Sequence, residues 1–185
     1  MVWEITPEEL LERYADGERN FAGIDLIKYH RPSPYSPKQP YRQPIELENV
    51  VLRDINLRGA NFEEICLTGV DLTGADLGGI FMRDCRLVKG IIRDANLRAA
   101  NLRFSGFFEA DLRGTNLDYM NASSADFRGV QIGSFECAIL ANTDFEGAHT
   151  ESGLICRGRN LIWNTTMPDG TIVRDPQWGN GRDAR

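Results

Sequence analysis

The stretch Ala95–Gly114 reads ANLRA ANLRF SGFFE ADLRG, four units of five residues that share one pattern. Each unit has a small residue first and a large apolar residue third, and three of the four have Asn or Asp between them. A helix repeats its apolar residues every three to four positions and a flat strand every two, so neither explains a period of five. Two apolar residues around a polar one are locally strand-like, and the other two residues suit a corner. The stretch therefore predicts a chain that coils.

The same period extends over most of the chain. Every fifth position from Leu47 to Ile132 gives 18 positions, of which only Ala122 is small. A globular antiparallel β-sandwich does not explain a period of five held over that length. The clearest copies of the unit are residues 60–64, 75–79, 95–99, 100–104 and 110–114.

These copies resemble the pentapeptide-repeat family, whose unit is A(D/N)LXX, and the resemblance covers most of residues 20–155. It implies an all-β solenoid: a right-handed quadrilateral parallel β-helix in which four repeats make one coil and residues 20 apart stack. The sequence is consistent with such stacking, because residues 20 apart form two uniform columns. The columns are Leu57, Leu77, Leu97 and Leu117, and Leu47, Leu67, Leu87, Phe107 and Phe127.

The ends of the chain differ from the repeats, and we expect three parts: residues 1–19, 20–160 and 161–185. The first is a short capping α-helix over Thr6–Gly17, with Thr6 as N-cap, Pro7 at the first helical position and Glu9 completing a capping box. We expect this helix to cover the first coil, because an uncovered solenoid end polymerises. The last part is a closing segment over Leu161–Ile172 with a Pro-Asp-Gly turn, followed by a frayed tail from about Asp175.

A proline-rich segment, residues 27–46, interrupts the repeats. It holds five of the eight prolines, and proline at this density favours an extended loop over helix or central strand. One interpretation is a partner-binding loop, since two PxxP motifs occur in it. The other is an excursion whose tyrosines pack on the coil. The residues proposed for binding are Tyr29, Pro34, Tyr35, Pro37, Pro40 and Tyr41.

The repeat changes phase after Ile132, where Phe135, Leu140 and Phe145 carry it onward. A bulge or a shortened face near residues 133–137 accounts for this change. Trp163 and Trp178 mark the C-terminal end as a second candidate surface, for a partner or for a homodimer formed through an end of the coil.

The reactive side chains form no motif typical of an enzyme. The two histidines, His30 and His149, lie in no metal or catalytic motif, and neither a phosphate loop nor a nucleophile elbow is present. We therefore expect no enzyme activity, no cofactor and no metal. Cys137 and Cys156 are 19 residues apart, close to one coil, so a disulfide between them is one alternative and free thiols are the other.

Composition narrows the classes of partner. The 185 residues carry a net charge of -6, and the chain has no apolar run long enough for a membrane span and no export signal, so we expect a cytoplasmic protein. Direct nucleic-acid binding is not expected at this charge. Relatives of this fold that mimic DNA to modulate DNA gyrase need a continuous acidic surface, whereas residues 47–132 hold 12 acidic and 10 basic side chains. A non-catalytic scaffold that binds an unknown protein partner is the favoured hypothesis.

Overall fold

The fold is known from a computed structural model, which describes residues 3–26, 30–33, 36–42, 45–133, 135–150, 155 and 159–178, with residues 30–33 and 36–42 described by backbone alone. It contains one helix, α1 (Pro7–Ala15), within this part of the chain. The strands are β1 (Trp3–Ile5), β2 (Ile24–Leu26), β3 (His30–Ser33), β4 (Ser36–Arg42), β5 (Ile45–Glu46), β6 (Ile65–Cys66), β7 (Asp111–Leu112), β8 (Gln131–Ile132), β9 (Ile139–Ala141), β10 (Leu161–Trp163), β11 (Thr165–Thr166), β12 (Ile172–Val173) and β13 (Gln177–Trp178).

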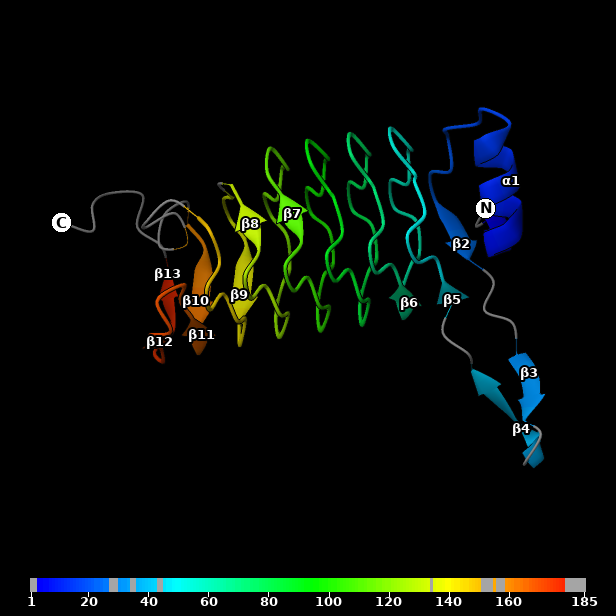
Figure 1. The fold of residues 1–185 in the computed structure, drawn as a ribbon. Coiled ribbons are helices and arrows are strands. Elements are labelled where there is room, and N and C mark those ends of the chain that lie inside the picture. Colours follow the sequence, from blue (N-terminus) through cyan, green and yellow to red (C-terminus); the bar gives the residue numbers. More distant parts are fainter. Residues whose placement is uncertain are drawn as a thin grey trace.

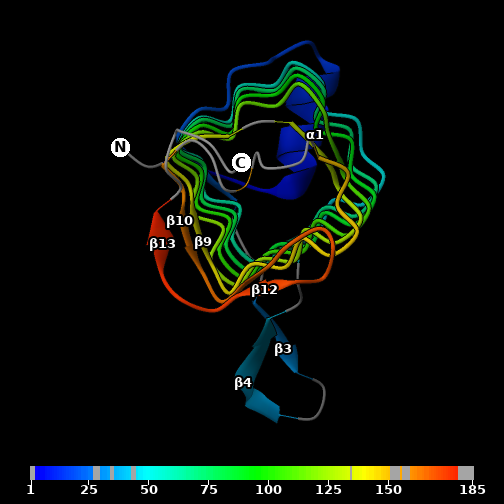
Figure 2. The same cartoon turned by 90° about the vertical axis from the view of Figure 1, so that its left-hand side faces the viewer.

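Successive coils stack in parallel, one above the next (Figure 1). One residue in each five-residue repeat of the central coils pairs with the residue 20 positions later, which gives four such pairs per coil. Val51 pairs with Asp71, Asn56 with Asp76, Asn61 with Phe81 and Cys66 with Arg86. Viewed close to the axis, the successive coils superimpose closely (Figure 2). The strand labels are sparse because most of these pairs are single bridges.

The corners recur every five residues and have a shared geometry. A backbone hydrogen bond closes many of the tight turns, as from the amide of Ala60 to the carbonyl of Leu57 at 3.1 Å. The residue before the donor has a positive φ, which is 63° at Gly59. Glycine, Asn and Asp adopt this conformation most readily, and they occupy many of these positions. The corners thus convert the five-residue period into a coil.

The core is a set of vertical columns inside the coils. The Leu57, Leu77, Leu97 and Leu117 column is fully buried, as predicted. The column that begins at Leu47 ends in stacked aromatic rings, as predicted. The ring centroids of Phe107 and Phe127 lie 4.7 Å apart with an interplanar angle of 4°. The Phe145 ring continues this stack, 5.3 Å from that of Phe127. Each coil therefore buries its apolar edge against its neighbours.

Helix α1 lies at the N-terminal end of the stack (Figure 1). It begins as the sequence predicts, with Pro7 in its first turn and the Thr6 Oγ1 accepting a hydrogen bond from the Glu9 amide at 3.1 Å. Leu10 is fully buried, and Leu11 and Tyr14 pack against the core. The Tyr14 hydroxyl also donates to the carbonyl of Arg53, at 3.0 Å. These contacts tie the helix to the first coils.

The proline-rich segment contains a β-hairpin, which corrects the prediction of a loop. Strands β3 and β4 pair antiparallel, with Pro32 opposite Pro40, and the hairpin projects away from the coils (Figures 1 and 2). In a two-stranded ribbon alternate amide groups point away from the partner strand, so proline is tolerated there. Asn20 pairs with Asn56, 36 positions later, so the segment adds 16 residues to a 20-residue coil.

Two later coils depart from 20 residues in opposite directions. Asn121 pairs with Ile139, 18 positions later, which confirms the predicted shortening after Ile132. In the next coil, Ile139 pairs with Leu161, 22 positions later. The added length falls after His149, which pairs with Gln131, and before Leu161.

The C-terminal end reverses the chain direction. β12 pairs antiparallel with β11 and β13 antiparallel with β10, whereas the coils pair in parallel. The predicted Pro-Asp-Gly turn is present, with a φ of 79° at Gly170 and a 2.9 Å hydrogen bond from its amide to the carbonyl of Met167. The prediction of a frayed tail from Asp175 is wrong for Gln177 and Trp178, because their backbone groups continue the sheet as β13.

Candidate functional site

One side of the β-helix is a ladder of paired residues that runs from the first strand to the last. We call it the long face; the two corners that border it are its edges. Because side chains alternate along a strand, the residues at the centre of its rungs share the outer side. These residues are Glu4, Asp25, Asn61, Phe81, Asn101, Asn121, Ile139, Leu161 and Trp178.

Exposed aromatic residues gather on the long face and at its edges. Within the described residues, eleven large apolar side chains are exposed, and six of them belong here. The six are Phe81, Phe104, Tyr119, Ile139, Trp163 and Trp178, with exposed fractions between 39% and 68%. Tryptophan, tyrosine and phenylalanine are enriched in protein interfaces, and gathered exposed apolar residues mark interaction sites.

Arginines stack on two of these rings. The Arg98 guanidinium carbon lies 4.4 Å from the centroid of Tyr119. Phe104 is flanked by two guanidinium groups, with the corresponding carbons of Arg83 and Arg103 at 5.4 Å and 5.3 Å. Such cation–π contacts hold both groups on the surface with little loss of accessibility. The surface therefore combines the two kinds of side chain that contribute most energy at protein interfaces.

Two of the aromatic residues occupy unfavourable backbone conformations. Phe104 and Tyr119 have φ values of 60° and 61°, in the left-handed region that bulky residues avoid. In the column of Tyr119 the equivalent residues of earlier coils are Gly59 and Gly79, which adopt this conformation freely. Each aromatic residue costs roughly 1 kcal/mol here, yet about half of its side chain is exposed to solvent. Their presence is not explained by the stability of the coil.

The arginines beside the opposite face are engaged differently, in ion pairs with Asp residues. Arg53 donates to the buried Asp71 at 2.7 Å, and Arg93 and Arg113 both bind Asp111, at 2.6 and 2.7 Å. Hydrogen bonds from Arg113 and Arg93 hold the pKa of the Asp111 carboxyl well below its usual range, against the opposing effect of burial. Burial also raises the pKa of Asp71, but hydrogen bonds from Arg53 and Thr73 outweigh it and the net shift is downward. These side chains stabilise the coil.

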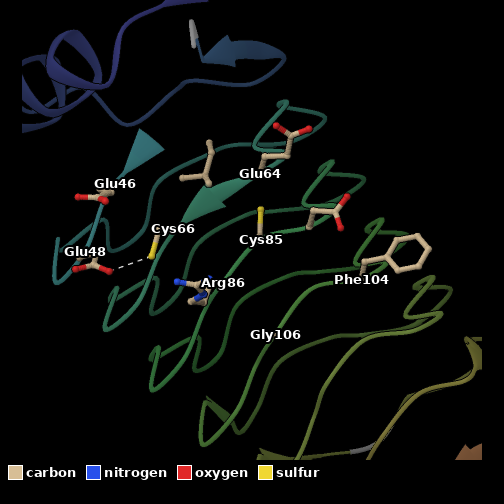
Figure 3. A pocket seen from close by; sticks show the side chains of 10 residues that line it. Glu46, Glu48, Glu64, Cys66, Cys85, Arg86, Phe104 and Gly106 are labelled. Carbon is tan, nitrogen blue, oxygen red and sulfur yellow. Dashed lines mark hydrogen bonds between the residues drawn. The ribbon is translucent and has the colours of Figure 1, made fainter. Parts of the chain in front are cut away.

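A hollow of about 300 Å³ lies beside the long face, across the corner at Phe104 (Figure 3). It forms where outward side chains are small: a Cβ added at Gly106 meets no atom within 4 Å. Its walls carry four carboxylates and one guanidinium, from Glu46, Glu48, Glu64, Asp84 and Arg86. The Cys66 thiol donates to the Glu48 carboxylate at 3.0 Å.

The hollow contains thiols and carboxylates but no histidine. Among the described residues that line it, the Cys66 thiol therefore has no imidazole base beside it. The residues that the structure describes contain no group of three or more His, Cys, Asp or Glu side chains arranged to hold a metal ion. In the same part of the chain, no helix is long and apolar enough to cross a bilayer.

The residues predicted for partner binding are only partly placed. Tyr29, Pro34 and Tyr35 lie outside the described residues. Pro37, Pro40 and Tyr41 are in β4, which is described by its backbone alone. The hairpin as a binding element therefore stays a prediction, and so does the alternative that its tyrosines pack on the coil.

The predicted disulfide also stays a prediction. Cys137 is partly buried and carries no disulfide in the structure. Cys156 lies outside the described residues, so its distance from Cys137 is not defined. Trp163 and Trp178, named from the sequence as a second surface, are both exposed and lie on neighbouring strands of the long face.

Sequence reasoning missed Phe81, Phe104, Tyr119 and Ile139 as one group. The signal was present: each departs from the Asn, Asp, Ser or Gly found at the equivalent position of other coils. Writing the sequence in rows of 20 would have aligned Phe81 with Asn61 and Asn101. The 18-residue coil hid Ile139, because it shifts that residue by two positions.

These observations define a class of protein: a parallel β-helix of five-residue repeats with an aromatic outer face. The sequence profile of the pentapeptide-repeat family, described as "Pentapeptide repeats", matches in eight copies over residues 45–74, 65–103 and 107–133. The chain belongs to this family, and its stack of coils is accordingly a right-handed β-helix. A comparison with curated protein sequences finds no match.

Solved structures of other pentapeptide-repeat proteins are similar to this chain. QnrB1, a plasmid-mediated fluoroquinolone resistance protein, in a trypsin-treated form, is 16% identical over 66% of this chain and 62% of its own, with a TM-score of 0.49. HetL, involved in heterocyst differentiation regulation in the cyanobacterium Nostoc, is 20% identical over 91% of this chain and 100% of its own, with a TM-score of 0.23. A protein of the Arabidopsis thaliana thylakoid lumen is 29% identical over 56% and 68%, with a TM-score of 0.29. At these scores the similarities carry no argument about function.

Proposed function

We propose that the protein is a non-catalytic scaffold that binds a protein partner through the long face. The observation that carries the proposal is the concentration of exposed aromatic residues there, six of the eleven exposed large apolar side chains in the described part of the chain. The strained corners at Phe104 and Tyr119 support it, because local departures from the best sequence for a fold concentrate at functional sites.

We also propose that the ends of the β-helix are closed, so that the long face is presented by a quadrilateral solenoid that does not polymerise. Support comes from the burial of Leu10 of α1 against the first coils. At the other end, the antiparallel β12 and β13 occupy edges to which a further parallel coil would add. Covered edges are how natural sheets avoid pairing with another chain.

A DNA-mimic function receives less support. Such a function needs uninterrupted negative charge, and Arg53, Arg93 and Arg113 neutralise Asp71 and Asp111 on the opposite face. The long face itself has Arg83 and Arg103 at one of its edges.

The test replaces the exposed aromatic residues with residues that other coils already use at equivalent positions. Phe81→Asn, Phe104→Ser and Tyr119→Gly are combined in one variant, following Asn61, Ser124 and Gly59. The matched control changes three exposed apolar residues on other faces, namely Val51→Asn, Ile91→Asn and Phe108→Thr. Both variants are expected to keep the far-ultraviolet circular dichroism spectrum of the wild type.

The readout is quantitative mass spectrometry of proteins retained from a lysate by each immobilised chain. We expect a set of proteins retained by the wild type and by the control but lost from the long-face variant. Equal retention by all three chains contradicts the proposal, and so does loss confined to the control variant. A fourth chain that lacks residues 28–43 separates binding by the hairpin from binding by the long face.

A further inference from the structure

The long face is divided into three zones along its length. Its N-terminal rungs are acidic, with Glu4, Asp25 and Glu63. Midway along its length, Arg83 and Arg103 lie at one edge beside the Phe104 ring, and Arg98 lies at the opposite edge against Tyr119. The last rungs are apolar and expose Ile139, Trp163 and Trp178. A surface with this order selects a partner by charge as well as by apolar area.

The arginines of the middle zone are available to a ligand. Among the described residues neither Arg98 nor Arg103 forms an ion pair, and both are exposed. Arg83 pairs with Asp84 at 3.0 Å, but half of its side chain is exposed. This contrasts with Arg93 and Arg113, which bind Asp111 on the opposite face. The middle zone therefore has an unneutralised positive charge in a protein whose net charge is -6.

The spacing of the zones fixes the geometry of a ligand that spans them. Three strand-to-strand steps separate the rung of Asn101, which carries Arg103, from the rung of Leu161, which carries Trp163. At ~4.8 Å per step this is roughly 14 Å, the length of about four residues of extended chain.

We propose that the long face binds an acidic segment of a partner protein in an extended conformation. Carboxylates of the segment lie against Arg83, Arg98 and Arg103, and an aromatic or aliphatic side chain about four residues away packs on Ile139, Trp163 and Trp178. The inference rests on the proposed function, because it names the partner chemistry for the same face. Arginine clusters beside apolar pockets are a recurrent mode of acidic-peptide recognition.

The surface suits a peptide better than a nucleic acid. Single-stranded nucleic acid needs a continuous basic groove with stacking rings. Here only the middle zone is basic, the preceding rungs are acidic, and Asp84 and Asp118 interrupt the positive charge. A peptide places a few carboxylates locally and leaves the rest of its length apolar.

Selection from a library of random 15-residue peptides displayed on phage tests the inference with the intact chain as bait. Enriched peptides are expected to carry at least two Asp or Glu residues and a large apolar residue about four positions away. A fluorescein-labelled copy of the most enriched peptide then serves in anisotropy titrations. Its affinity is expected to fall at least tenfold in the variant Arg98→Glu with Arg103→Glu. It is expected to stay within twofold in Lys89→Glu, which reverses a single charge, half of the change in the double variant, on an exposed corner away from the long face.

Each other outcome overturns the inference. Enrichment of basic or uncharged peptides overturns the inference that the ligand is acidic. If such peptides bind more weakly to the variant with Phe81, Phe104 and Tyr119 replaced, the proposed function of the long face is still supported. Absence of any enrichment, or equal binding by the arginine variant, also refutes it. Tighter binding of a 20-nucleotide oligothymidylate makes the ligand a nucleic acid. A dimer by sedimentation equilibrium that Trp163→Ser dissociates makes the occupant a second copy of the chain.

Discussion

Phe127→Ala offers the sharpest test of how this β-helix is stabilised. The Phe127 side chain is fully buried and its ring lies between two others, 4.7 Å from Phe107 and 5.3 Å from Phe145. Truncating a buried Phe to Ala costs about 3–5 kcal/mol of unfolding free energy. Each stacked pair contributes roughly 0.5–1.5 kcal/mol within such a loss. We therefore expect the variant to lose about 4 kcal/mol.

A second substitution separates the loss of volume from the loss of stacking. Phe127→Leu keeps most of the volume and restores the residue found at Leu67 and Leu87 of the same column, so it should cost only about 1–2 kcal/mol. Phe108→Ala, at a side chain 37% exposed, is the control and should cost less than about 0.5 kcal/mol.

The measurement is urea unfolding followed by far-ultraviolet circular dichroism. With a slope of about 2.5 kcal/mol per molar urea, the Phe127→Ala midpoint should fall by roughly 1.5 M. Equal midpoints for Phe127→Ala and Phe127→Leu would refute the reasoning, because cavity formation would then contribute nothing. A changed slope would show that the coils unfold in separate steps, and each step would then be fitted by itself.

Three further predictions concern the ion pairs, the helix and the hairpin. Asp111→Asn should cost about 1–2 kcal/mol of unfolding free energy at pH 7. Because the pKa of Asp111 is lowered in the folded state, its contribution to stability is present above an unfolded pKa of ~3.9 and is lost as pH falls through the folded value. The urea midpoints of wild type and variant should therefore converge between about pH 4 and 2. Thr6→Ala should cost about 1 kcal/mol, measured by thermal unfolding, and Thr6→Ser should cost much less because it keeps the hydroxyl that accepts from the Glu9 amide. Deleting residues 28–43 removes the 16 added residues and should leave the melting temperature within about 5 °C of the wild-type value. Loss of the β-sheet circular dichroism spectrum in this variant would contradict the prediction.

Much of the fold could be predicted because the period of five is a local property. Each unit contains the inward residues that form the core and the residue that turns the corner, so the Leu57 column and its neighbours followed from the sequence. The N-cap at Thr6 was equally local, since its hydroxyl bonds an amide three residues away. The hairpin at residues 30–42 was not predicted, because proline statistics exclude a central strand but not a two-stranded ribbon.

The sequence by itself determined the coil and its buried columns, since apolar burial at every fifth residue leaves one arrangement that satisfies all units. Only the tertiary structure decided which outward residues meet. Phe81, Tyr119 and Ile139 come from three coils, and their common face depends on an 18-residue coil that follows a series of 20-residue coils. The physical reason is that outward side chains are not selected by the core, so their pattern in the sequence is irregular. Their position is fixed by the hydrogen-bonded register between coils, which places distant residues side by side.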